Sequence, residues 1–194
     1  MDTIIHNLQH VQARIDKACQ AVGRDPKEVK LLLATKTVTP ERIQQALAAG
    51  YTLIAENKVQ ELKEKYEALK ATPHTNHFIG HLQTNKIKDI LKYDVSCVES
   101  LDRYDLAEKL HQKLSQAGRE MDVFIQVNTS GEESKFGVAP EEALALTQQV
   151  AQLPTLHIRG LMTIGLFSAE EDKVRKCFQL LKSIQQQIFA LNLP

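Results

Sequence analysis

The chain has 194 residues, enough for one sizeable core and too few for two ordinary domains. Lysine plus arginine and aspartate plus glutamate number 24 each, and this zero net charge argues against a general electrostatic grip on nucleic acid or on an anionic membrane. The cysteines form neither a disulfide framework nor a CxxC site, no signal-peptide pattern opens the chain, and no apolar run approaches membrane-spanning length, so we expect a cytoplasmic protein.

The apolar pattern alternates between strand and helix along the whole chain. A helix is expected at residues 3–22, and strands at residues 31–35, 51–55, 77–80, 95–98, 123–127 and 157–163, with an amphipathic helix after each strand. This alternation predicts an α/β fold with parallel strands and right-handed crossovers, either a TIM-type (β/α) barrel or an open doubly wound sheet. No GxGxxG follows the first strand and no GxxxxGK[ST] occurs anywhere in the sequence, which weakens the nucleotide-binding forms of the open sheet.

The first expected strand leads into a lysine that could act as a nucleophile. Its apolar run without alternation is typical of a parallel strand buried on both faces, and it leads into Lys36. Thr39 and Pro40 then mark the start of a helix, with Thr39 as its N-cap. Burial at the strand end would lower the pKa of Lys36 and make its amine nucleophilic, as a Schiff base with a carbonyl cofactor requires. The alternative is a strand-end lysine that reaches into solvent.

Other polar residues are expected near the same place. In a barrel the carboxyl ends of the strands meet at one face, and the polar residues there are Lys36, Asn57, His81, Asn128 and Thr163. His77 begins its strand and would lie deeper if it points inward. A metal site built from His74, His77 and His81 is not expected, because His74 points to the opposite face of the segment and no carboxylate or thiol is close by in sequence.

Simpler interpretations exist for several of these residues. Asn57 could cap the helix that follows it, and Met162 could be an ordinary core residue. The charge run at residues 61–65 is expected to be an exposed helix face, on which Glu61 and Lys65 pair at a spacing of four residues.

Five local sequences resemble a known family. They are ATKT at 34–37, ENKVQE at 56–61, HFIGHLQTNK at 77–86, VNTSGEESKFG at 127–137 and GLMTI at 160–164. Together they are similar to the pyridoxal phosphate homeostasis proteins, the single-domain relatives of the alanine racemase barrel. The resemblance runs from about residue 31 to about residue 165, in order and with fitting spacing, and the HFIGHLQTNK block is its most specific part.

The resemblance implies a fold, a cofactor and a role. It implies a single (β/α) barrel domain over residues 1–194 that binds pyridoxal 5'-phosphate (PLP, a form of vitamin B6) and helps to balance PLP and amino-acid pools without turnover of its own. Lys36 would hold the cofactor as a Schiff base, Asn57 would lie near its ring, and His77 and Met162 would line its pocket. Relatives continue with two further strands that hold the cofactor phosphate, so the expectation is six of the eight barrel strands, with the C-terminal strands missing.

Two other functions remain open from the sequence. A PLP-dependent amino-acid racemase is the main alternative, but the racemases with this barrel use a second acid/base group from an additional β domain of the partner subunit. The other alternative is a scaffold that binds protein partners only, and no such partner is indicated by the residues.

Overall fold

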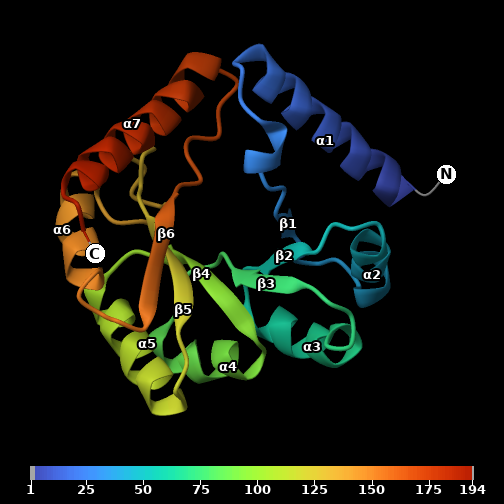
Figure 1. Ribbon diagram of the computed structural model, residues 1–194, viewed down its shortest axis with the longest axis horizontal. Helices are drawn as coiled ribbons and strands as arrows, with labels where there is room; N and C mark the ends of the chain where they lie inside the picture. Colours follow the sequence, from blue (N-terminus) through green and yellow to red (C-terminus); the bar gives the residue numbers. More distant parts are fainter. Residues whose placement is uncertain (1–2, 194) are drawn as a thin grey trace. The chain divides into compact units, whose positions relative to one another are not determined.

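The computed structural model describes residues 3–193, which fall into two compact units divided between His77 and Phe78. In the first unit (Figure 1) the elements are α1 (Thr3–Ala21), β1 (Leu33–Ala34), α2 (Pro40–Ala48), β2 (Leu53–Glu56), α3 (Val59–Leu69) and β3 (Thr75–Phe78), which ends at the boundary. The second unit contains α4 (Ile87–Lys92), β4 (Val95–Leu101), α5 (Tyr104–Ala117), β5 (Met121–Gln126), α6 (Ala143–Val150), β6 (Leu156–Met162) and α7 (Glu171–Ala190). No helix within residues 3–193 combines the length and the apolar character that a membrane span needs.

The core of the first unit lies between its strands and the helices α2 and α3. Its buried cluster consists of Ile43, Leu47, Ile54 and Leu69. The strands β1 and β2 pair in parallel, with Leu33 opposite Ile54 and Ala34 opposite Ala55. Because side chains alternate across a strand, Leu33 and Ile54 face the helices, while the two alanines face the other way.

The strand β1 is shorter and more open than predicted. It covers Leu33–Ala34 instead of residues 31–35, although the amide of Thr35 still donates a hydrogen bond of 2.9 Å to the carbonyl of Ala55. The expected burial on both faces is wrong, since Leu33 is half-buried and Ala34 is exposed. Leu33 packs against the buried cluster of this unit, whereas Ala34 is not part of that cluster.

The strand β3 begins earlier than predicted, at Thr75 instead of His77. The amide of Thr75 donates a hydrogen bond of 2.8 Å to the carbonyl of Thr52 and so starts the pairing with β2. In a parallel ladder this bond sets His77 level with Ala55, on the same face of the sheet. His77 is therefore the third residue of its strand and lies within it.

The second unit is built on parallel strands. In the pairing of β4 with β5, Val98 lies opposite Val123, and β5 runs beside β6 from Met121 to Gln126, which lies opposite Met162. The register between β5 and β6 shifts once, just after Val123, where β6 holds an additional residue. The helices α5 and α6 contribute buried apolar side chains to the core of this unit, among them Leu106, Leu110, Leu114, Leu146 and Val150.

Candidate functional site

Lys36 lies in the turn that follows β1, beside the end of β2. Continuing the register of the two strands by two residues places Lys36 level with Asn57, on the face of the sheet that Ala34 and Ala55 share. The side chain of Lys36 is exposed, so the burial that the sequence predicted for it is wrong. The amine of Lys36 is therefore open to solvent.

The peptide group on the amino-terminal side of Lys36 is held by several hydrogen bonds. Thr35 is 4% exposed, and its hydroxyl Oγ1 donates to the carboxylate Oε1 of Glu56 at 2.7 Å and lies 3.1 Å from the carbonyl of Ala55. The carbonyl oxygen of Thr35 accepts a hydrogen bond of 2.8 Å from the ammonium Nζ of Lys65. The chain is therefore fixed just before Lys36.

The residue after Lys36 has an unusual backbone conformation. Thr37 has a φ of +63°, in the left-handed region, where a non-glycine residue costs on the order of 1–3 kcal/mol unless its surroundings impose it. Its amide donates to both carboxylate oxygens of Glu61, at 3.0 and 3.2 Å, and its hydroxyl donates to the carbonyl of Lys36 at 2.6 Å. The carboxylate of Glu61 thus holds the turn in this conformation.

A largely buried cluster of polar and charged side chains connects the chain before Lys36 with the chain after it. We call Lys65, Glu56, Glu61 and Thr35 the Lys65 cluster. The Nζ of Lys65 donates to Glu56 Oε1 at 2.7 Å and to Glu61 Oε2 at 2.6 Å, and the residue is only 7% exposed. The hydrogen bond from Lys65 is the main cause that lowers the pKa of the Glu61 carboxyl, with the amide of Thr37 acting in the same direction.

The sequence predicted the pairing of Glu61 with Lys65 but not its burial. The pair is confirmed at 2.6 Å, whereas the expectation of an exposed face is wrong for Lys65, which is a buried residue of α3. A signal was present in the spacing, because Lys65 lies three residues after Leu62 and four before Leu69, on the apolar stripe of the helix. Because the neighbouring residues of this segment are charged, the buried position of Lys65 was not recognised from the sequence.

Asn57 does not serve as the helix cap that the sequence allowed as its simpler role. The helix α3 begins at Val59 with Lys58 at the N-cap position, so Asn57 does not cap it. Asn57 is half-buried, and its side-chain oxygen Oδ1 is inaccessible to solvent and has no hydrogen-bond partner among the described residues. A buried, unsatisfied amide oxygen in line with Lys36 is a group that a ligand at this edge could satisfy.

The remaining expected residues are divided between the units. His77 is half-buried on the same face of the first unit as Lys36 and Asn57. Met162 ends β6 in the second unit, where it is half-buried and its carbonyl accepts a hydrogen bond of 2.9 Å from the amide of Val127. The structure therefore brings Lys36, Asn57 and His77 to one face of the first unit and gives Met162 a strand-end position in the second.

The other polar strand ends of the second unit make contacts within that unit. The ring of His81 stacks on Phe136 with a centroid distance of 4.2 Å. The amide Nδ2 of Asn128 donates to the carbonyl of Glu132 at 2.9 Å, inside the loop that follows β5. The hydroxyl of Thr163 lies 2.9 Å from that of Thr129, which ties the ends of β5 and β6 together.

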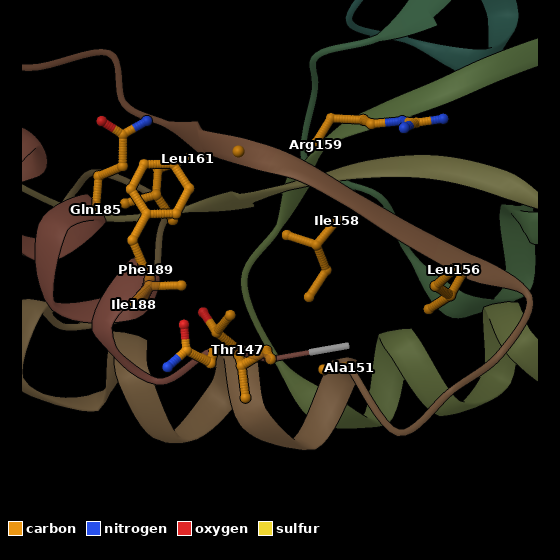
Figure 2. A pocket seen from close by; sticks show the side chains of 12 residues that line it. Thr147, Ala151, Leu156, Ile158, Arg159, Leu161, Gln185, Ile188 and Phe189 are labelled. Atoms are coloured by element: carbon orange, nitrogen blue, oxygen red, sulfur yellow. The ribbon is translucent and has the colours of Figure 1, made fainter.

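A cavity of about 410 Å³ in the second unit lies elsewhere, between β6, α6 and α7. Figure 2 shows Ile158 pointing into it from β6, with Ile188 and Phe189 contributed by α7. Arg159 points to the other side of the strand, where it pairs with Asp122 at 2.8 Å. None of the residues expected to hold a cofactor lines this cavity, so it is separate from the candidate site.

Comparison with known proteins decides the family. The model of the alanine racemase N-terminal domain matches residues 1–193. The pyridoxal phosphate homeostasis protein of Aquifex aeolicus is 40% identical over 181 residues, which cover 93% of this chain and 79% of that protein. The protein of the same name from Pseudomonas aeruginosa is 40% identical over 184 residues, covering 95% and 80%. The chain belongs to the pyridoxal phosphate homeostasis protein family, within the alanine racemase N-terminal domain group.

Solved structures agree with this family. An unknown protein from Bifidobacterium adolescentis matches with a TM-score of 0.90 and 35% identity, covering 98% of this chain and 81% of that one. PipY of Synechococcus elongatus, solved with PLP bound, matches with a TM-score of 0.72 and 26% identity, covering 90% and 82%. An alanine racemase of Clostridium difficile, at 15% identity and a TM-score of 0.75, shares the fold. The alternation of strands and helices is as predicted, and the (β/α) barrel class, which the family resemblance implied, is confirmed.

Proposed function

We propose that this chain is a PLP-binding protein of PLP and amino-acid homeostasis, and that it holds the cofactor as a Schiff base on Lys36. The observation that carries the proposal is the position of Lys36, exposed at the carboxyl end of β1 and level with Asn57, in a chain of this family. The PLP-bound PipY structure and the names of the homeostasis proteins support the choice of cofactor. We propose that the protein binds PLP in the cytoplasm and that residues 1–194 belong to a single PLP-binding domain.

The residues present fit such a cofactor. Lys36 would hold PLP through its amine, as a Schiff base formed with loss of water, and the bound cofactor would supply the aldehyde for that bond. Asn57 offers a buried amide oxygen without a partner, which can accept a hydrogen bond from a polar group of the ligand. His77 lies on the same face of the first unit, and we assign to it the lining of the pocket; the cofactor contact that the resemblance gave to Met162 stays a prediction.

The test is to trap the attachment chemically. The protein is mixed with PLP, reduced with borohydride, digested and mapped by mass spectrometry, with Lys36→Ala as the control. We expect the adduct on Lys36 and none at that peptide in the variant. An adduct carried by Lys58 or Lys86 instead would overturn the assignment.

We further propose that the chain is not an amino-acid racemase. Lys36 can exchange a proton with only one face of a bound amino acid, and efficient inversion needs a second donor on the opposite face within hydrogen-bond reach. We expect chiral analysis of L-alanine incubated with the PLP-loaded protein to show only slow background racemisation. Steady turnover at an enzyme-like rate would refute this proposal and favour the racemase.

A further inference from the structure

We propose that Lys65 is a positioning residue for Lys36: through the Lys65 cluster it fixes the chain on both sides of Lys36 and so directs the amine toward the cofactor aldehyde. This inference rests on the proposed function, because it concerns the attachment of PLP to Lys36. Lys65 itself is on the buried face of α3 and lies in a cluster that the attachment reaction does not use. Its role would be to act through the backbone.

The first part of the argument is that Lys65 grips the chain before Lys36. Its Nζ donates directly to the carbonyl oxygen of Thr35, at 2.8 Å, in the peptide group that joins Thr35 to Lys36. The same Nζ donates to Glu56, whose Oε1 also accepts from the hydroxyl of Thr35 at 2.7 Å. Both contacts are buried, so water does not compete for them, and they fix the direction in which β1 ends.

The second part is that Lys65 controls the chain after Lys36 through one intermediate. Glu61 binds the amide of Thr37 with both carboxylate oxygens, and its Oε2 lies 2.6 Å from the Nζ of Lys65. Thr37 is β-branched and has a φ of +63°, a conformation that needs support from its surroundings. The ammonium group holds the carboxylate, and the carboxylate holds the turn.

The third part of the argument concerns the side chain of Lys36, which can move while its backbone is held. The side chain of Lys36 is exposed, whereas the residues before and after it are tied to β2 and α3 by the contacts above. A flexible four-carbon side chain on a fixed backbone starts from one place and covers a limited set of directions. Loss of the cluster would let the turn relax, and fewer encounters with the aldehyde would then be productive.

The experiment measures how fast the Schiff base forms. Stopped-flow absorbance after mixing with PLP is recorded for the wild type, Lys65→Met and Glu61→Ala. The matched controls are Lys70→Met and Glu64→Ala, because both residues are exposed on or next to the same helix. We expect the rate constant to fall by at least about tenfold in the two cluster variants, as misplacement of a reacting group predicts, and to stay within about twofold in the controls.

A second readout separates positioning from loss of folding. Amide hydrogen exchange of Thr37 is measured by NMR on the folded, cofactor-free proteins, and we expect protection to be lost in Glu61→Ala and Lys65→Met but kept in both controls. Glu61 is partly accessible, at 18% exposure, so its alanine variant carries the test if Lys65→Met does not fold. Lys65→Arg, which keeps the charge, is expected to recover part of the rate.

The outcomes separate the inference from the function. If the wild type forms the Lys36 adduct while folded Glu61→Ala reacts as fast as Glu64→Ala, the positioning role is refuted and the proposed function stands. If the wild type forms no adduct on Lys36, the proposed function is refuted, and the positioning role with it.

Discussion

Replacing Lys65 with methionine keeps most of the volume of the side chain and removes its charge. Three hydrogen bonds are lost, to Thr35, Glu56 and Glu61. Glu56 is only 2% exposed, and its second oxygen Oε2 already has no partner among the described residues, so its carboxylate would be left buried without a cation. Removing one partner of a buried ion pair costs roughly 3–5 kcal/mol. We expect Lys65→Met to lose this amount of unfolding free energy, a large part of the 5–15 kcal/mol or so of an ordinary domain.

The assay is urea denaturation followed by circular dichroism, with Lys70→Met as the matched control. Lys70 pairs with Glu67, but both side chains are exposed, at 51% and 74%, and such pairs contribute about 0–1 kcal/mol. The double variant Glu56→Gln/Lys65→Met should be more stable than Lys65→Met alone, because it removes the unpaired buried carboxylate. A loss in Lys65→Met as small as that in Lys70→Met would refute the reasoning, since it would mean that water or rearrangement satisfies the cluster.

Three further predictions concern titration, backbone and thiol. The pKa of Glu61 is lowered from its ordinary value of 4.5, so the ionised carboxylate stabilises the fold above that pH, and this stabilisation is lost as the pH falls through the lower pKa of the folded state. Urea denaturation between pH 5 and about 3 should therefore show that the unfolding free energy falls less in Glu61→Gln than in the wild type. Gly137 has a φ of +125° and a Cβ there would lie 2.5 Å from the backbone nitrogen of Asn128, so Gly137→Ala should cost about 2 kcal/mol or more in the same assay, against roughly 1 kcal/mol for Gly131→Ala, where the space is open. Burial raises the pKa of the Cys97 thiol, with nearby carboxylates acting in the same direction, so iodoacetamide should leave Cys97 unlabelled in the native protein and label it after denaturation, as peptide mass mapping would show.

The sequence by itself determined the order of the elements and the place of the key lysine. Apolar spacing is a local property of strands and helices, and it predicted the alternation from α1 to α7. The position of Lys36 just after β1 and of Asn57 just after β2 follows from the same local pattern, because each strand ends where its apolar run ends. The five local sequences that resemble the family then indicated PLP as the cofactor.

Only the tertiary structure decided which of these side chains are buried. The pair of Glu61 and Lys65 has the same spacing on an exposed helix face as on a buried one, and its burial depends on how α3 packs against the end of β2. The exposure of Ala34 in β1 depends likewise on how the helices pack, and the register of His77 depends on the pairing of β3 with β2, which the bond from Thr75 to Thr52 begins. Burial and register are set by contacts between separate elements, such as the bond from Lys65 to the carbonyl of Thr35, 30 residues earlier, and no local pattern of apolar and charged residues specifies such contacts.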